Sequence, residues 1–270
     1  RLISKVPPAV AKAAMDTGVA RKAIVDMDQY ASDLSARLNP SEGLLQKIFQ
    51  EVKENPKRVI FTEGEEEDMI RSAAIFLNNG MGTPILIGRE EIIKQKMSDI
   101  GLDFFDQMEI HSTRNKSEHD RYAEHIYERL QRKGFLKKDC LELLSNERNV
   151  FAACMVSLND ADAMICGLTR SYAASLESIE YVLDPIPNKT ILGMTVMLCN
   201  GRTIFVADSN VHDMPNAKQL ANITQESAEV VRDVFGIEPR AALVSYSNFG
   251  KPFTERSVYM KNAIKILDER

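Results

Sequence analysis

The sequence predicts an α/β protein with a mostly parallel sheet that is covered by helices on both faces. Over much of the 270-residue chain, short apolar runs alternate with amphipathic segments. Strands that alternate with helices of about 10–15 residues are typical of parallel sheets joined by crossover helices. The composition, 44% hydrophobic and 27% charged, is that of an ordinary globular protein, and the length allows one large domain or two modest ones.

The composition also excludes several classes of protein and partner. It does not fit a disordered chain, a collagen-like repeat or a small disulfide-rich protein. A net charge of −5 offers no general attraction to nucleic acid or to an anionic membrane surface. No apolar run approaches the roughly 20 residues of a membrane span. We therefore expect neither nucleic acid nor a membrane as a partner.

The N-terminus and the cysteines favour a cytoplasmic location. The N-terminus lacks the features of a signal peptide, and because the chain begins with Arg1 we expect a fragment or a processed chain. The cysteines show no CxxC spacing, so we expect buried or partly buried free thiols and no metal site. They are Cys140, Cys154, Cys166 and Cys199.

Residues 1–38 predict two short helices that are too small to own a core and must pack on something else. The first is expected to start at Pro7-Pro8, because proline fits the first turn of a helix, and the second covers residues 28–37. Pro40 marks a boundary, and Ser41 is expected to cap the helix that follows.

The alternation is clearest from residue 59 onward. Four apolar runs are expected to be strands, the last of them of the buried type: 59–62, 84–88, 108–110 and 161–166. Helical spacing of apolar residues predicts helices over 66–79, 90–99, 117–133, 149–158 and 171–182.

A proline-containing block at 184–188 is expected to be a hinge or a subdomain border. Beyond it, Asn200-Gly201 is the strongest short hairpin signal in the chain. The strands expected here are 190–198, 203–207 and 241–245, and the helices are 217–235 and 255–267.

Ligands of open α/β sheets bind outside the carboxyl ends of the strands, which directs attention to the loops that follow strands. The turn from Gly167 to Ser171 places Thr169, Arg170 and Ser171 at the start of a helix. Backbone N–H groups at such a position bind anions, and Arg170 would complete a phosphate site. A simple helix cap by Thr169 or Ser171 explains the same residues, and both interpretations stay open.

Two more loops carry candidate residues. Ser247, Asn248 and Lys251 follow a predicted strand and would cradle a phosphate or a pantetheine amide, although neither the P-loop spacing nor GxGxxG is present. Asp208 and Asn210 end another strand, where they are either catalytic or part of a turn.

The acidic run from Glu63 to Asp68 has two interpretations, a metal site or the first turn of a helix, where the helix dipole favours carboxylates. We favour the helix terminus, because no histidine or second carboxylate loop is evident nearby. His111, His119 and His125 are expected in a polar, solvated region, and no catalytic triad follows from the spacing.

Several segments resemble phosphate acetyltransferases (phosphotransacetylases), in the correct order from about residue 44 to 270. The βαβ segment is Val59–Gly64 with Ile70–Ala74 and Leu86–Gly88, and Asp160–Gly167 resembles the family's GDADxxxxG strand. Three further segments resemble family motifs: Phe205–Val211 with Pro215 and Ala217, Phe235–Pro239, and Val244–Gly250.

The sequence is more similar still to the phosphotransacetylase-like C-terminal domain of bacterial NADP-dependent malic enzymes. Pro8–Arg21 resembles the closing helix of a malic-enzyme catalytic region. Gly167–Tyr172 also follows the malic-enzyme version of its motif, where the transferases have His-Ser-Thr.

This resemblance implies a three-layer α/β/α sandwich of two subdomains with a cleft between them. Residues 1–38 would be a catalytic-region tail and linker, 39–187 the first subdomain, and 188–270 an incomplete second one. The domain would sense acetyl-CoA, contact the malic-enzyme catalytic domain and help to assemble a homo-oligomer. The parent enzyme would decarboxylate malate oxidatively to pyruvate with NADP and Mg²⁺ or Mn²⁺, while this segment would hold no cofactor of its own.

The binding residues that the resemblance implies are the loop residues already described. Arg170 and Lys251 would meet the phosphates of CoA, whereas Ser247 and Asn248 would bind the pantetheine or acetyl group. The full candidate set is Thr169, Arg170, Ser171, Asn210, Ser247, Asn248 and Lys251. We expect no catalytic residue, because the family's late catalytic segment would follow Arg270.

Departures from the transferase pattern favour binding without phosphate chemistry. Where the family has arginines, this chain has Asp68, Leu130 and Glu177, and Lys251-Pro252 replaces the serine after the loop glycine. Loss of fixed cations removes charge-assisted phosphate contacts. Two alternatives remain: an active phosphate acetyltransferase, and a purely structural assembly domain without a ligand.

Overall fold

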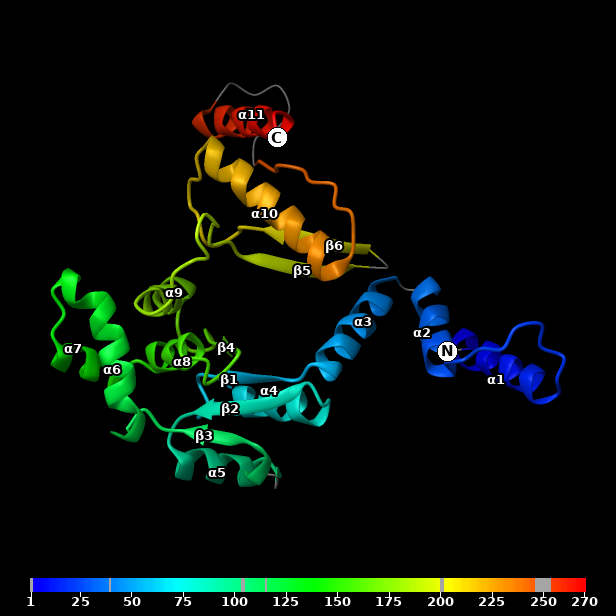
Figure 1. Cartoon of the computed structure of the whole chain (residues 1–270), viewed down its shortest axis with the longest axis horizontal. Coiled ribbons are helices and arrows are strands. Elements are labelled where there is room, and N and C mark those ends of the chain that lie inside the picture. Colours follow the sequence, from blue (N-terminus) through cyan, green and yellow to red (C-terminus); the bar gives the residue numbers. More distant parts are fainter. Residues whose placement is uncertain (1, 39, 103–104, 115, 200–201, 246–253) are drawn as a thin grey trace. The chain divides into compact units, whose positions relative to one another are not determined.

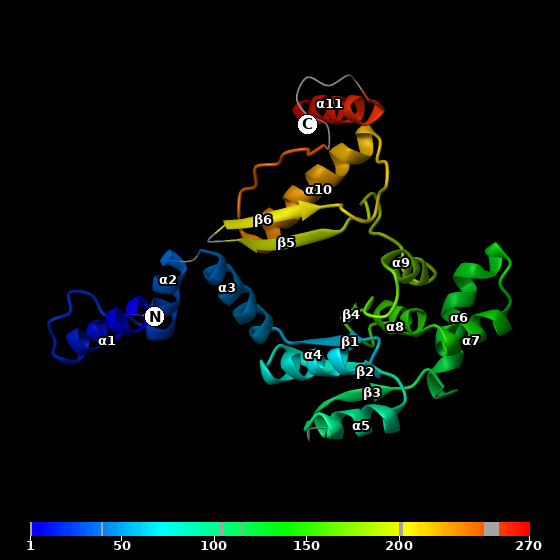
Figure 2. The same cartoon turned by 180° about the vertical axis from the view of Figure 1, so that it is seen from behind.

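The computed structural model describes residues 2–38, 40–102, 105–114, 116–199, 202–245 and 254–270. It divides into two compact units, residues 49–184 and residues 1–48 together with 185–270. Figures 1 and 2 show their elements from opposite sides. The domain boundaries expected at 38/39 and at 187/188 stay predictions.

Residues 49–184 contain a sheet and the helices that cover it. The strands are β1 (Lys57–Phe61), β2 (Gly82–Ile87), β3 (Glu109–His111) and β4 (Ala163–Ile165). The helices are α4 (Glu67–Asn78), α5 (Glu90–Asp99), α6 (Lys116–Leu130), α7 (Lys137–Asn146), α8 (Arg148–Ser157) and α9 (Tyr172–Glu180). Short 3₁₀ turns occur at Phe105–Gln107 and Gln131–Lys133.

The sheet is parallel throughout, in the order β3-β2-β1-β4. Ile60 of β1 pairs with Ile85 of β2 on one side and with Met164 of β4 on the other. The carboxyl ends of β1 and β4 therefore lie side by side, and the segments that follow them are neighbours. The predicted fold class, an α/β protein with a parallel sheet, is confirmed.

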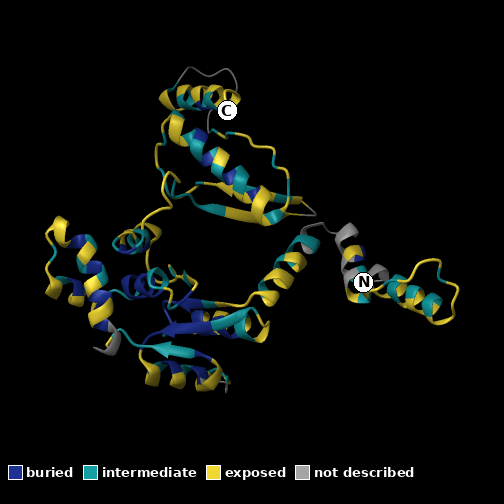
Figure 3. Ribbon diagram, in the orientation of Figure 1, coloured by how far each residue is buried: buried dark blue, intermediate teal, exposed yellow. Residues whose placement is uncertain are grey.

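Successive side chains of a strand point to opposite faces, and both faces of this sheet are buried. Ile60 packs with Tyr122 of α6 and Phe151 of α8, whereas Phe61 packs with Ile70 of α4. All five side chains are 2% exposed or less, and burial of each stabilises the fold by about 1.5–3 kcal/mol. Figure 3 shows β1 and β2 as the buried centre of this unit, between two helical layers.

The structure corrects two expectations in this unit. β4 is not a strand of the buried type, because among the described strands it pairs only with β1, and Ala163 and Ile165 are exposed. Helix α7 was not predicted, although Leu136, Cys140 and Leu144 have helical spacing and the last two are fully buried. The other predicted strands and helices are present, and the long helix α6 ends in a 3₁₀ turn before Gly134.

Residues 185–270 contain the predicted hairpin and two helices. β5 (Met194–Cys199) and β6 (Arg202–Ala207) are antiparallel, with Met194 opposite Ala207; the turn residues Asn200-Gly201 lie outside the described residues. α10 (Ala217–Phe235) begins after Asn216, whose side chain forms a capping box with Gln219, and α11 (Glu255–Asp268) follows. The strand expected at 241–245 is absent, because no described strand donates or accepts hydrogen bonds along it.

The N-terminal helices begin earlier than predicted. α1 (Leu2–Asp16) includes Pro7 and Pro8, although each proline removes a backbone hydrogen bond; α2 is Met27–Leu38. α3 (Pro40–Glu54) starts at Pro40, so Ser41 lies inside the helix and not at its cap. Proline at the first helical position explains this start, since its missing N–H would have no partner there. No described helix is both long enough and apolar enough to span a membrane.

Candidate functional site

The loop from Gly167 to Ser171 joins β4 to α9 at the carboxyl edge of the sheet. Gly167 has φ +100°, a left-handed conformation that glycine adopts without strain and that turns the chain sharply after the strand. Ser171 caps α9, its Oγ accepting a hydrogen bond from the N–H of Ala174 at 3.4 Å. The interpretation of Ser171 as a helix cap is therefore confirmed.

A buried carboxylate occupies the backbone donors of this loop. Glu63, two residues after β1, is 3% exposed. Its Oε1 accepts the N–H groups of Gly167 and Leu168 at 3.1 Å each and that of Thr169 at 3.4 Å. Its Oε2 accepts the hydroxyl of Thr62 at 2.8 Å. The loop does bind an anion, as its geometry suggested, but in the structure that anion is the protein's own side chain.

Arg170, the predicted phosphate ligand, is also held by a carboxylate. Its two terminal nitrogens donate to the two carboxylate oxygens of Glu147, which lies between α7 and α8. The arginine side chain is 39% exposed and that of Glu147 27%, so the pair lies at the surface and is open to solvent. Bidentate pairing of this kind is the strong geometry for arginine and a carboxylate. The binding role of Thr169 and Arg170 stays a prediction.

The acidic run divides into two groups. Glu67 and Asp68 lie in the first turn of α4, as the helix-terminus interpretation predicts. Glu63 and Glu65 precede the helix, so that interpretation is wrong for them. Hydrogen bonds from the Arg89 side chain are the main cause that lowers the pKa of Glu65 to about 2. No group of three or more potential metal ligands gathers among the described residues.

Two positions at which the resemblance implies arginines, Leu130 and Glu177, carry no cation in this chain. Leu130, the last residue of α6, is 1% exposed and packs in the core. The neighbouring Arg129 points elsewhere and donates to Asp184, with one N···O distance of 2.6 Å. Glu177, on α9, accepts the hydroxyl of Tyr181 at 3.4 Å. None of these positions supplies a free cation to the loop.

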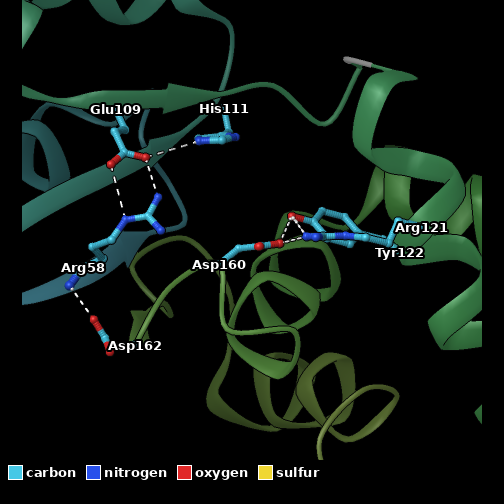
Figure 4. Close-up of polar contacts among 7 residues, drawn as sticks. All are labelled: Arg58, Glu109, His111, Arg121, Tyr122, Asp160 and Asp162. Carbon is cyan, nitrogen blue, oxygen red and sulfur yellow. Dashed lines mark hydrogen bonds and ion pairs between the residues drawn. The ribbon is translucent and has the colours of Figure 1, made fainter.

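The aspartates of the DADAMICG segment lie at the opposite end of β4 from the loop. Asp162 accepts the backbone N–H of Arg58 at 2.8 Å, and Asp160 accepts the Tyr122 hydroxyl at 2.7 Å and pairs with Arg121. Figure 4 shows these contacts together with the ion pair between Arg58 and Glu109. The two aspartates therefore fasten β4 to β1 and to α6, which is a structural role.

The histidines differ in part from expectation. His119 is not solvated but 6% exposed, with its ring against the edge of Phe151, because α6 packs this face against α8. His125 lies 2.9 Å from Ser157 Oγ, and burial lowers its pKa. Among the thiols, Cys199 corrects the prediction of burial: it is exposed, like the rest of β5 after Met194.

The remaining candidates belong to the other unit or lie outside the described residues. Asn210 is exposed in the loop after β6. Ser247, Asn248 and Lys251 fall within residues 246–253, outside the described part of the chain. The structure therefore brings together Thr169, Arg170 and Ser171 alone, and the rest of the predicted set stays a prediction.

One acid–histidine pair in the second unit was not identified from the sequence. His212 Nδ1 lies 2.7 Å from Asp208 Oδ2, and the aspartate side chain is 5% exposed with φ +54°. Asp208 also lines a cavity of about 790 Å³ between β6, α10 and α11. The i,i+4 separation of an acid and a histidine was the available signal.

The fold and this edge of the sheet define a class: an α/β protein with a parallel sheet whose loop after β4 is organised around buried and half-buried carboxylates. Comparison with known proteins then identifies the family. Residues 43–270 match the family described as Phosphate acetyl/butaryl transferase, and the chain belongs to that family.

The relatives include malic enzymes as well as acetyltransferases. The chain is 46% identical over 271 residues to the NADP-dependent malic enzyme of Rhizobium meliloti, and 35% identical over 274 residues to that of Escherichia coli. Both alignments cover 100% of this chain and 36% of the relative. The phosphate acetyltransferase of Nitratidesulfovibrio vulgaris is 28% identical over 225 residues, covering 80% of this chain and 32% of that protein. The resemblance to malic enzymes is confirmed, and the chain spans little more than a third of their length.

Solved phosphotransacetylases share the fold. The EutD phosphotransacetylase from Staphylococcus aureus superposes with a TM-score of 0.72 at 21% identity, over 84% of this chain and 68% of that one. The phosphotransacetylase from Streptococcus pyogenes gives 0.69 at 24% identity, over 83% and 69%.

Proposed function

We propose that this chain is an acetyl-CoA-sensing regulatory and oligomerisation module of an NADP-dependent malic enzyme. The parent enzyme would decarboxylate malate oxidatively to pyruvate in the cytoplasm, using NADP and Mg²⁺ or Mn²⁺ held outside this segment. One observation carries the proposal. The transferase family accounts for residues 43–270 alone, whereas the malic enzymes match the whole chain, including residues 1–42.

The site supports a module that binds but does not transform. Transfer of an acetyl group between CoA and phosphate requires fixed cations that point at the reacting oxygens. In the described loop the backbone donors are occupied by Glu63 and the guanidinium of Arg170 by Glu147. With Leu130 buried and Glu177 in place of a cation, an inorganic phosphate has little to hold it here.

Regulation requires that acetyl-CoA distinguish two states of the enzyme. A ligand shifts an equilibrium only by the difference between its affinities for the two states. Inhibition would require acetyl-CoA to prefer the less active arrangement of the enzyme. The ligand residues are Thr169, Arg170, Ser171, Asn210, Ser247, Asn248 and Lys251.

The test compares malate turnover by the full-length enzyme with that of a form lacking residues 39–270, each with and without acetyl-CoA. The proposal expects acetyl-CoA to lower turnover only in the full-length enzyme. Equal effects on both forms would overturn it. Unchanged oligomer size and melting temperature at saturating acetyl-CoA would instead favour a structural assembly domain.

The second candidate is an active phosphate acetyltransferase, which the 28% identity to the Nitratidesulfovibrio vulgaris enzyme favours. In that reaction the CoA thiolate attacks the carbonyl of acetyl phosphate and phosphate leaves; the reverse direction releases free CoA from acetyl-CoA and phosphate. Sustained thiol release with phosphate present, lost in Arg170→Ala or Lys251→Ala, would replace the regulatory proposal with this one.

A further inference from the structure

The loop from Gly167 to Ser171 has few ways left to bind an anion. Three of its N–H groups point at the buried Oε1 of Glu63. Displacing this carboxylate would leave a side chain that is only 3% exposed without its hydrogen bonds, which is unfavourable. At this loop, the Arg170 side chain is therefore the group left for a phosphate-bearing ligand.

Glu147 is positioned to control access to that guanidinium. Both terminal nitrogens of Arg170 donate to its carboxylate, one of them at 3.3 Å. Glu147 is also fixed by its place in the chain: its N–H donates to Leu143 O at the end of α7, and its carbonyl accepts the N–H of Phe151 in α8. The carboxylate is therefore presented to Arg170 by two packed helices and not by a mobile loop.

The surroundings of this pair carry more negative charge. Burial raises the pKa of Tyr181, and the charges of Glu177 and Glu147 raise it further. The Tyr181 hydroxyl itself donates to Glu177. An anionic ligand that approaches Arg170 thus meets the Glu147 carboxylate, and Glu177 adds negative charge near Tyr181.

We propose that Glu147 is a specificity-determining residue of this site: it neutralises Arg170, so that a phosphate group binds only by taking the guanidinium from it. This inference rests on the proposed binding function and adds the residue that limits it. A large thioester can bind because its other contacts with the protein compensate for breaking the ion pair. A small anion has no such contacts and would have to replace Glu147 by itself.

The test is isothermal titration calorimetry on the full-length enzyme with two probes, acetyl-CoA and inorganic pyrophosphate. The variants are Glu147→Gln, Arg170→Ala and the double variant. Glu142→Gln is the matched control, because it removes an equal charge from an exposed position of α7. Glutamine keeps the size of the side chain, and circular dichroism checks that each variant folds.

Glu147→Gln should tighten binding roughly two- to fivefold, the range expected for releasing a solvent-exposed ion pair. Arg170→Ala should weaken binding, and Glu147→Gln should add nothing in that background, because Glu147 acts through Arg170. Glu142→Gln should leave binding unchanged, and added salt should shrink the gain of Glu147→Gln.

Three results would overturn the inference: no gain in Glu147→Gln with either probe, an equal gain in Glu142→Gln, or a gain that persists without Arg170. Failure of every protein to bind acetyl-CoA would overturn the proposed function instead. In that case the pyrophosphate titrations still test the role of Glu147. If no variant binds pyrophosphate either, the inference about Glu147 is also overturned.

Discussion

At the scale of single residues, carboxylates organise the loop after β4. Glu63 ties the loop to β1 through three backbone N–H groups, and Glu147 holds the one arginine that the loop presents. A carboxylate with several backbone donors is stable when buried because each lone pair finds a partner. Glu63 thus positions the backbone of the loop that carries Thr169 and Arg170.

Removal of Glu63 should loosen this loop and lower stability. Glu63→Ala removes the buried carboxylate that accepts three N–H groups of the loop, so the free energy of unfolding should fall by about 1–3 kcal/mol. Hydrogen exchange of the peptide that contains Gly167–Thr169 should accelerate. Glu66→Gln is the control, since Glu66 precedes α4 without a side-chain cap bond. Equal exchange in all three proteins would show that Glu63 does not hold the loop.

The ion pair between Glu65 and Arg89 should make stability depend on pH in acid. The folded-state pKa of Glu65 is about 2, below its ordinary 4.5. Its contribution is therefore present above about pH 4.5 and lost as the pH falls toward 2. Because Arg89 is more than half exposed, we expect about 1–2 kcal/mol rather than the full value of the shift.

Urea unfolding of wild type and Glu65→Gln from pH 7 to pH 2 measures this contribution. The stability difference should be present at pH 7 and vanish near pH 2. Glu67→Gln, which removes an exposed carboxylate paired with Arg71, should change stability by no more than about 0.5 kcal/mol. A difference between wild type and Glu65→Gln that stays constant with pH would refute the assignment.

The contact partners of Glu63 could not be predicted from the sequence. Glu63 and the loop that it holds are 104 or more residues apart, and they meet only because β4 pairs with β1. Strand order is a property of the assembled sheet, so the acidic run looked like a helix terminus throughout. That interpretation holds for Glu67 and Asp68, whose role depends on neighbours in the chain.

At the scale of elements, one glycine allows β1 and β2 to pair closely. Gly82, the first residue of β2, has φ +152°, and a Cβ there would lie 2.0 Å from the carbonyl oxygen of Lys57. Gly80, two residues earlier, has φ +65° and open space around its Cα. A substitution at Gly80 therefore introduces backbone strain alone, whereas one at Gly82 introduces both strain and steric overlap.

Gly82→Ala should therefore destabilise the chain far more than Gly80→Ala. We expect a loss of at least about 2 kcal/mol for Gly82→Ala, because strain and overlap add. Gly80→Ala should cost about 1 kcal/mol, from the left-handed conformation alone. Chemical denaturation of both variants checks this ranking, and similar losses at both positions would contradict the described entry into β2.

Elements with local signals were predicted well, whereas elements that depend on partners were not. α10 was predicted at its observed bounds because its cap, its periodicity and Gly236 all lie within the segment. The strand expected at 241–245 has the apolar residues of a strand but no described neighbour to complete its hydrogen bonds. An apolar run shows only that the composition of a segment is compatible with a strand. Whether the strand forms depends on a neighbouring strand that pairs with it.

At the scale of the whole molecule, the family motifs carried more information than periodicity. They led to the transferase fold and to the malic enzymes, both of which the comparisons support. The predicted ligand set could not be assembled from the structure, because Arg170 and Asn210 belong to different compact units and Ser247, Asn248 and Lys251 lie outside the described residues.

We propose that this domain binds acetyl-CoA without consuming it. Equilibrium dialysis of acetyl-CoA against the full-length enzyme in phosphate buffer tests it most directly, with the thioester and free CoA quantified on both sides of the membrane. We predict saturable binding, with the acetyl-CoA recovered intact. Steady conversion to CoA, or no saturable binding at all, would contradict the account.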